Sequence, residues 1–340
     1  MPDPGPQPRP ALALVESPAQ LLNAIEWAYH SGTPTTAVVL GPTDPTTRWQ
    51  LHRVAELAPD PVAVQWAEVR SGARAPALAR VARGVRAAGT VVIGDPYSGI
   101  IHTLLNLVGT DPRLVVIDDG TATIRYAEQW ATGVPLNRWH LGATDARVHP
   151  LRRRAQRLLG HRSAAVELFT AMPLLTGTAP HTGTGDTPTG DTPPVTPNTY
   201  AWVRDTFGPP RVLAGTDLMG TSLVESGLIS EDAYLAGIAG LVAGRSVARY
   251  LPHRKESAAK LARIAALGPQ LVRPALPMEL YARIGPIGRT LLSFPSTVLH
   301  TLPLVLAGTG VEIAALSVAD SWFTGTAAAD QRDFVNRITG

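Results

Sequence analysis

The stretch LVVIDDG (residues 114–120) decides the fold class. Its four consecutive apolar residues, Leu114–Ile117, predict a strand that is buried on both faces, and the glycine after the two acids turns the chain. The stretch TVVI (residues 90–93) repeats the apolar pattern, and an amphipathic helix is expected before it, at Ala77–Ala88. Continuous Val, Ile and Leu strands that alternate with helices indicate a parallel sheet covered on both faces.

The same alternation extends towards both ends of the chain. The N-terminal half adds predicted strands at 11–15 (ALALV), 36–40 (TAVVL) and 62–65, a helix that carries Leu21, Leu22, Ile25 and Trp27, and a helix at 47–57. The C-terminal half is predicted to contain strands at 211–214, 247–251, 290–294 and 310–316, and helices at 231–244, 255–267, 275–284 and from Ser296. We therefore expect an α/β, GT-B-like chain, in which two Rossmann-like domains face each other across a central cleft and ligands bind at the carboxyl ends of the strands.

A low-complexity stretch, TGTAPHTGTGDTPTGDTPPVTP (Thr176–Pro197), separates the two halves. Its Thr, Gly and Pro content is typical of a flexible loop or linker. The predicted organisation is an N-terminal domain at 1–175, a linker at 176–200 and a C-terminal domain at 201–340.

Composition restricts the function classes. The chain has 340 residues, of which 45% are hydrophobic and 17% charged, so two globular domains fit its length. It contains no cysteine, which excludes disulfides, thiolate metal sites and cysteine nucleophiles. The formal net charge is only +3, and a nucleic-acid partner is not expected, because basic residues interleaved with aromatics are missing.

Two observations bear on location. The first ten residues, MPDPGPQPRP, lack the basic start and apolar core of a signal peptide, and no stretch reaches the ~18 uncharged apolar residues of a membrane span. The expected location is cytoplasmic. The cluster of arginines at 152, 153, 154, 157 and 162 predicts a solvated helix face, with peripheral contact to the inner membrane surface or to an anionic acceptor as the alternative.

Three polar motifs follow predicted strands. Asp118-Asp119-Gly120 presents two adjacent carboxylates, whose mutual repulsion favours protonation and suits a general base; helix capping is the alternative. His253, followed by Arg254 and Lys255, is expected at the start of a helix, where cations and free N–H groups bind anions.

The third motif is Ser293-Phe294-Pro295-Ser296-Thr297. Ser296 and Thr297 are expected at a helix N-terminus, where they would offer hydroxyl and backbone N–H groups to a phosphate, or simply cap the helix.

Together these motifs resemble those of bacterial sialyltransferases, and most closely of their polysialyltransferase-like branch. That family is marked by an acidic-acidic-glycine, a His-Pro and a Ser-Ser/Thr motif. Further similar segments are Ser17–Trp27 (SPAQLLNAIEW), Gly215-Thr216, Gly220–Ile229 (GTSLVESGLI) and Pro277-Met278-Glu279, in the family's order along most of the chain. In place of His-Pro this chain has His253-Arg254, which leaves the donor uncertain.

The resemblance implies a role for each motif. Asp119 would be the general base, with Asp118 as its companion, and His253 would bind or protonate the donor phosphate. Donor contacts would come from Arg254, Ser296, Thr297, Gly215, Thr216, Thr221, Ser222 and Glu279, and acceptor-side contacts from Ser17, Gln20 and Asn23.

The activity that the resemblance implies is inverting transfer of a sialic-acid-like (nonulosonic) sugar from a CMP-activated donor to a hydroxyl of a glycan or small-molecule acceptor. A monophosphate leaving group needs no bridging cation, so no cofactor or metal is expected. Four alternatives stay open: a transferase for another CMP-activated acid such as Kdo, one that uses a nucleotide-diphosphate sugar, a nucleotide-sugar hydrolase, and a catalytically silent nucleotide-binding protein on the same fold.

Overall fold

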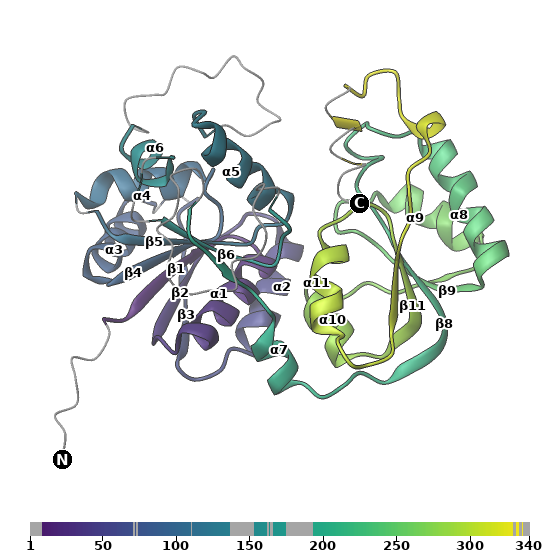
Figure 1. Cartoon of the computed structure of the whole chain (residues 1–340), viewed down its shortest axis with the longest axis horizontal. Helices are drawn as coiled ribbons and strands as arrows, with labels where there is room; N and C mark the ends of the chain where they lie inside the picture. Colours follow the sequence, from purple (N-terminus) through teal and green to yellow (C-terminus); the bar gives the residue numbers. More distant parts are fainter. Residues whose placement is uncertain are drawn as a thin grey trace. The chain divides into compact units, whose positions relative to one another are not determined.

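The computed structural model describes residues 9–70, 72, 74–109, 111–136, 153–161, 163, 166–174, 193–328, 331, 332 and 335. The chain divides into two compact units, Met1–Trp202 and Val203–Gly340, each built on its own sheet (Figure 1). Every strand pairing in both sheets is parallel, which confirms the prediction of an α/β chain with two Rossmann-like halves.

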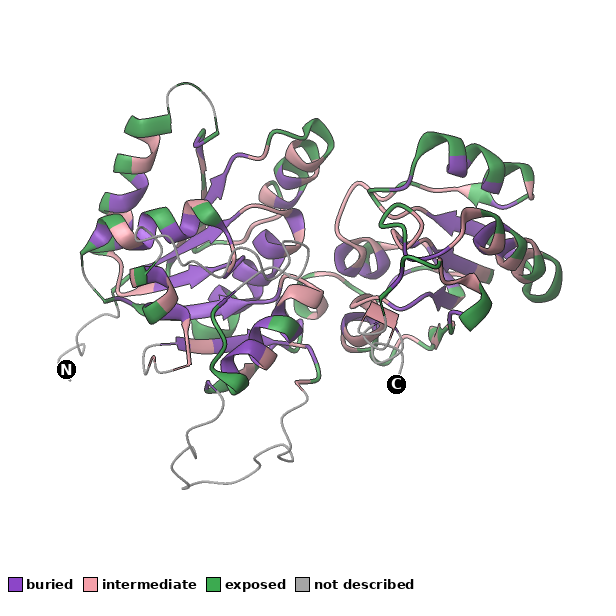
Figure 2. Ribbon diagram, turned by 90° about the horizontal axis from the view of Figure 1, so that it is seen from above, coloured by how far each residue is buried: buried purple, intermediate pink, exposed green. Residues whose placement is uncertain are grey.

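Unit 1 contains a seven-stranded sheet with the strand order β3-β2-β1-β4-β5-β6-β7. Its strands are β1 (Ala11–Val15), β2 (Thr35–Leu40), β3 (Val62–Ala67), β4 (Thr90–Ile93), β5 (Arg113–Ile117), β6 (Val166–Thr170) and β7 (Val195–Pro197). The central strands are buried along nearly their whole length, as continuous apolar runs require (Figure 2). The strand order reverses between β1 and β4, which is the position where open α/β sheets bind ligands.

The helices of unit 1 are α1 (Pro18–Ser31), α2 (Pro45–Ala55), α3 (Arg74–Ala87), α4 (Gly99–Val108), α5 (Thr121–Thr132), α6 (Arg153–Leu159) and α7 (Ala201–Thr206), which continues into unit 2. Helices α1 and α2 contact each other, and α4 contacts both α3 and α6. Ser17, Asp44 and Ser98 cap the first turns of α1, α2 and α4 through side-chain oxygens.

Unit 2 contains a five-stranded sheet with the order β10-β9-β8-β11-β12. Its strands are β8 (Val212–Met219), β9 (Val247–Leu251), β10 (Gln270–Leu271), β11 (Ile287–Ser293) and β12 (Glu312–Ala315). Its helices are α8 (Glu231–Arg245), α9 (Ala258–Ala266), α10 (Met278–Ile284), α11 (Val298–Val305) and the 3-10 helix η4 (Asp320–Trp322). The strand order reverses between β8 and β11.

Most predicted elements are present, and β1, β4 and β9 have the predicted bounds. Strand β8 continues to Met219, beyond the predicted end at Ala214, because the Asp217 carboxylate is buried against Arg249 of the neighbouring strand. Helix α9 begins at Ala258 rather than Lys255, because Ser257 provides the cap.

The predicted linker ends earlier than expected. Residues 176–192 lie outside the described residues, but Val195–Pro197 form β7 and pair with β6, so a linker that extends to residue 200 is wrong. A strand with Thr and Pro in this position is tolerated because β7 is the edge of the sheet. The elements that were not predicted are the strands β6, β7 and β10, the helices α4, α5 and α7 and the 3-10 helix η4. In the described part of the chain, no helix has both the length and the apolar character that crossing a membrane requires.

Candidate functional site

Three loops of unit 2 begin at the same edge of its sheet. Strand β8 lies between β9 and β11, with Met219 level with Leu251 on one side and Ser293 on the other. The Gly220 N–H donates to the Leu251 carbonyl at 2.8 Å, which continues this alignment one residue beyond the strand. The structure therefore brings the loops that carry Thr221, His253 and Ser296 to the carboxyl ends of neighbouring strands, at the point where the strand order reverses.

His253 is held in a defined orientation and protonation state. Its backbone N–H donates to Oε1 of Glu256 (2.6 Å), and its ring Nδ1 accepts from the Lys255 N–H (3.2 Å). Because Nδ1 is an acceptor, the ring proton of the neutral imidazole lies on Nε2. Burial, followed by the positive charges of Arg254 and Lys255, lowers the pKa of His253 to about 4. At neutral pH His253 is therefore an uncharged hydrogen-bond donor.

The two cations beside His253 lie in a turn and not in a helix. Arg254 and Lys255 are exposed, and α9 starts three residues after Lys255, with the Ser257 hydroxyl accepting from the Lys260 N–H. The expectation that the motif forms a helix N-terminus is wrong. An anion at this loop could bind the Nε2–H of His253 and the solvated positive charges of Arg254 and Lys255.

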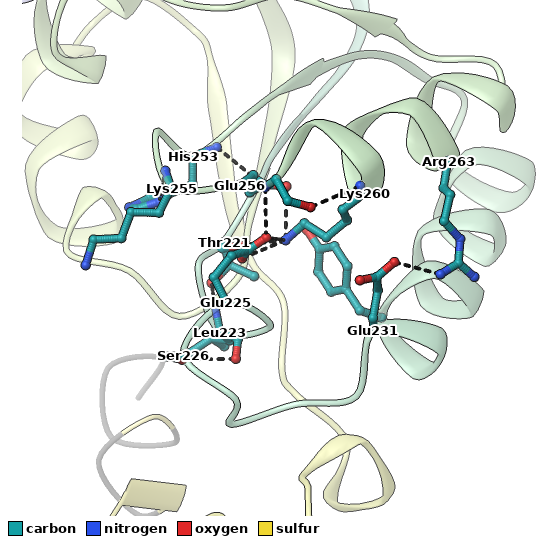
Figure 3. Close-up of polar contacts among 12 residues, drawn as sticks. Thr221, Leu223, Glu225, Ser226, Glu231, His253, Lys255, Glu256, Lys260 and Arg263 are labelled. Carbon is teal, nitrogen blue, oxygen red and sulfur yellow. Dashed lines mark hydrogen bonds and ion pairs between the residues drawn. The ribbon is translucent and has the colours of Figure 1, made fainter. Parts of the chain in front are cut away.

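A buried ionic cluster, which the motifs did not predict, lies directly beneath this loop (Figure 3). Lys260 is fully buried, and its Nζ lies 2.9 Å from a carboxylate oxygen of Glu225 and 3.2 Å from Oε2 of Glu256. It also donates to the Thr221 carbonyl at 3.2 Å and sits over the ring of Tyr234. A buried ammonium group is stable only when it is paired and hydrogen-bonded in this way.

The cluster joins two of the three loops. Glu256 accepts from the Tyr250 hydroxyl (2.7 Å), which in turn lies 2.7 Å from the Tyr234 hydroxyl. Burial raises the pKa of Glu256, whereas Lys260 opposes the rise. A Cβ atom on Gly220 would lie 1.9 Å from Oε1 of Glu256 and 2.5 Å from the Tyr250 hydroxyl, so a larger residue here would displace the groups of the cluster. The i, i+4 spacing of Glu256 and Lys260 is the feature of the sequence that indicates this ion pair.

The loops after β8 and β11 contribute hydroxyl and backbone groups. Ser296 and Thr297 are partly buried, and Thr297 precedes α11 without a side-chain hydrogen bond to the first turn of that helix. Backbone bonds close the first turn of α11: the Leu299 N–H donates to the Ser296 carbonyl at 3.1 Å, and the His300 N–H donates to the Thr297 carbonyl at 3.0 Å. Thr221 is buried, and its hydroxyl accepts from the Leu223 N–H at 3.3 Å, so it shapes the turn; Ser222 beside it is partly exposed.

Three predicted donor contacts lie elsewhere in unit 2. Gly215 and Thr216 lie within β8, where the pairing with the neighbouring strands is irregular and Gly215 has a φ of 105°. Gly215 is four residues before the carboxyl end of the strand. Glu279 of α10 is buried and accepts from the Thr301 hydroxyl of α11 at 2.7 Å, and burial raises its pKa. The structure therefore gives Glu279 the role of joining two helices.

In unit 1 the paired acids differ sharply in environment. Asp118 is buried, and its carboxylate accepts from the Thr170 hydroxyl and from the Ala171 N–H (2.7 Å). Asp119 is partly exposed, and its N–H donates to the Thr123 hydroxyl at 2.9 Å. Gly120 follows with a φ of 64°, a left-handed conformation that favours glycine, and α5 begins immediately after it. Asp118 therefore fastens β5 to the end of β6, and Asp119 is the more accessible acid.

The predicted acceptor-side residues maintain this loop region. Ser17 caps α1, Gln20 accepts from the Glu16 N–H at 2.7 Å, and Asn23 donates to the Asp118 carbonyl at 3.0 Å. Gln20 and Asn23 are buried, and Asn23 also accepts from Asn198 at 3.0 Å. They act on the backbone around the acids rather than as a surface for a ligand.

Glu16, at the end of β1, was not predicted. It pairs with Arg70, and burial raises its pKa against the effect of that arginine. Its position at the point where the strand order reverses makes it a further candidate for a polar contact in unit 1.

Comparison with known proteins gives no family. No protein-family model matches the sequence, and no curated protein matches it. The resemblance to sialyltransferases therefore rests on the motifs alone.

Solved structures show a weak overall likeness to the chain. They include Phytolacca americana UGT2 complexed with UDP-2fluoro-glucose and pterostilbene (14% identity, 98% of this chain and 94% of that chain, TM-score 0.45). A putative UDP-N-acetylglucosamine 2-epimerase from Listeria monocytogenes has 11% identity over 91% of this chain and 79% of its own, with a TM-score of 0.47. Acinetobacter baumannii MurG has 12% identity over 96% of this chain and 81% of its own, with a TM-score of 0.41. At these identities and scores the likeness says nothing about activity, and the fold assignment stands on the two parallel sheets.

Proposed function

We propose that this protein is an inverting, metal-independent, cytoplasmic glycosyltransferase that moves a sialic-acid-like sugar from a CMP-activated donor to an acceptor hydroxyl. The observation that carries the proposal is the loop cluster of unit 2, where a neutral His253 with its proton on Nε2 accompanies the hydroxyls of Ser296 and Thr297 at the reversal of strand order. This cluster is suited to a phosphate monoester.

The chemistry would follow from charge development. When the bond between the anomeric carbon and the phosphate oxygen breaks, negative charge grows on CMP, and the sugar takes on oxocarbenium character. The Nε2–H of His253 and the hydroxyls of Ser296 and Thr297 would stabilise that charge, with Arg254 adding a solvated positive charge. A neutral donor such as this histidine strengthens its hydrogen bond as the charge on the oxygen increases.

Asp119 of unit 1 would accept the proton of the attacking acceptor hydroxyl. Its partial exposure supports this role, whereas Asp118 has its carboxylate engaged by Thr170 and Ala171 and would act as a positioning residue. We expect Thr221, Ser222 and Gly220 to shape the donor loop. Glu279 lies in a helix interface and Gly215-Thr216 lie within a strand, so the proposal includes no donor contact from them.

The test is a thermal-shift titration of the full chain with CMP, UMP, UDP and GDP in the presence of a chelator. We expect CMP alone to raise the melting temperature, and His253→Asn to abolish that shift. Stabilisation by UDP or GDP instead would overturn the donor class. If CMP bound but CMP-linked sugars were hydrolysed at a rate independent of added acceptor, the protein would be a hydrolase.

A further inference from the structure

One face of unit 1 concentrates positive charge. Helices α3, α4 and α6 lie side by side (Figure 1), and within their described ranges they contain seven arginines and no acidic residue. The arginines, which we call the arginine face, are Arg74, Arg80, Arg83 and Arg86 on α3 and Arg153, Arg154 and Arg157 on α6. Arg152 and Arg162 of the predicted cluster lie outside the described residues. The neighbouring helices α1 and α2 carry no comparable cluster.

Six of the seven arginines are exposed and Arg154 is partly buried, and Arg80 donates to the Trp66 carbonyl of β3 at 3.2 Å. On α3 the apolar residues Val81 and Val85 are buried in the core, which leaves the arginines on the solvent side. Arg86 donates to the carbonyl of Leu107 (2.7 Å) at the end of α4, and Arg154 reaches Asp111 just beyond it at 2.5 Å. The C-terminal end of α4 is thus flanked by arginines from both neighbouring helices.

Two exposed apolar side chains lie in or next to segments that contact these helices. Of the six large apolar residues that are exposed in the described part of the chain, two are Leu107 (50%) and Val134 (53%). Leu107 lies next to Arg86, which donates to its carbonyl. Val134 lies two residues before Leu136, and the N–H and the carbonyl of Leu136 both form hydrogen bonds with the side chain of Gln156 on α6. Arginines around exposed aliphatic side chains are typical of surfaces that lie in the headgroup region of a bilayer.

We propose that unit 1 docks peripherally on an anionic phospholipid bilayer through the arginine face, with Leu107 and Val134 entering the headgroup layer. The charge complementarity is direct, since anionic headgroups would meet seven arginines, of which Arg154 and Arg157 pair with Asp111. A single-stranded nucleic acid is a poorer fit, because α3, α4 and α6 contain no Phe, Tyr or Trp on which bases could stack. The inference is independent of the donor and the reaction.

The experiment is co-sedimentation of the full chain with vesicles of phosphatidylcholine alone and of phosphatidylcholine mixed with phosphatidylglycerol, at low and high salt. We expect binding to the mixed vesicles only, weakened by salt. A juxtamembrane arginine changes binding by roughly five-fold, so Arg74→Ala/Arg83→Ala/Arg153→Ala should weaken it by on the order of 100-fold. These three side chains are exposed on helices, where alanine is well tolerated.

The matched control is Arg211→Ala/Arg245→Ala/Arg289→Ala, which removes the same charge from exposed positions of unit 2. It should bind mixed vesicles like the unchanged protein, and Leu107→Ser should reduce binding several-fold without changing its salt dependence. Equal losses in both triple variants would overturn the proposal, as would equal binding to both vesicle types. Tight binding to a single-stranded oligonucleotide with no vesicle binding would also overturn it, in favour of a nucleic-acid surface.

Discussion

At the scale of single residues, the two adjacent acids show how burial separates functions that the sequence presents as equal. Asp118 is 2% exposed and bonded through its carboxylate, whereas Asp119 is partly exposed at the same loop. Adjacent residues in an extended segment point in opposite directions, so one acid faces the protein interior and the other does not.

This difference predicts opposite outcomes for matched substitutions. Asp119→Asn should abolish sugar transfer while leaving the melting temperature and CMP binding unchanged, because the base acts on the acceptor. Asp118→Asn replaces one of the two acceptor oxygens, which bind the Thr170 hydroxyl and the Ala171 N–H, with an N–H₂ and should lower the free energy of unfolding by about 1–3 kcal/mol. Urea unfolding measures the free energy of unfolding of each variant, and a CMP-release assay measures its sugar transfer. Full activity of Asp119→Asn would show that another group is the base.

The second residue-scale prediction concerns His253. Its pKa of about 4 in the folded protein lies below the ordinary value of 6.5, so the unfolded chain binds the proton more tightly. The resulting stability is fully present above pH 6.5 and is lost as the pH falls towards 4. Between these values the melting temperature of the unchanged protein should fall more steeply than that of His253→Asn, which keeps an acceptor for the Lys255 N–H.

NMR titration of the imidazole checks the same value directly. We expect a pKa near 4 in the free protein and a higher value with CMP bound, because a phosphate favours the imidazolium. A free-protein pKa near 6.5 would contradict the burial of this ring.

At the scale of elements, the buried cluster around Lys260 links helix α9 to the loop after β8. Lys260→Met should lower the free energy of unfolding by about 3 kcal/mol, because it leaves the Glu256 and Glu225 carboxylates without their cation. The loss should be smaller at low pH, since Glu256 can then be protonated. Urea unfolding at two pH values measures both effects.

Arg263→Met, on the same helix, is the matched control. Arg263 pairs with Glu231 and Asp232 but is 53% exposed, so its loss should change stability by less than about 1 kcal/mol (Figure 3). If the two substitutions had equal effects, the ionic cluster would not be what holds the loop.

At the scale of the whole molecule, the two units have separate sheets and separate hydrophobic cores. Each is expected to have its own unfolding transition in calorimetry. Asp118→Asn should lower one transition and Lys260→Met the other, and CMP should raise only the transition that Lys260→Met lowers. A single transition that responds equally to all three would show that the units unfold as one.

The sequence by itself determined the class of the fold and most of its strands and helices. Runs such as ALALV, TVVI and LVVI are apolar at every position or nearly so, and only a strand inside a covered parallel sheet buries such a run on both faces. It also placed the polar motifs at strand ends, because glycine, serine and acidic residues interrupt the apolar pattern there.

Only the tertiary structure decided which of those residues are accessible and what charge they carry. Asp217 interrupts an apolar run and predicts a loop, yet Arg249 keeps it inside a strand from 32 positions away. Lys260 is buried because Glu225, 35 positions away, neutralises it together with Glu256. The neutral state of His253 likewise depends on burial by elements that only the fold brings together. Apolar periodicity is local in the sequence, whereas desolvation and charge pairing depend on neighbours that folding supplies.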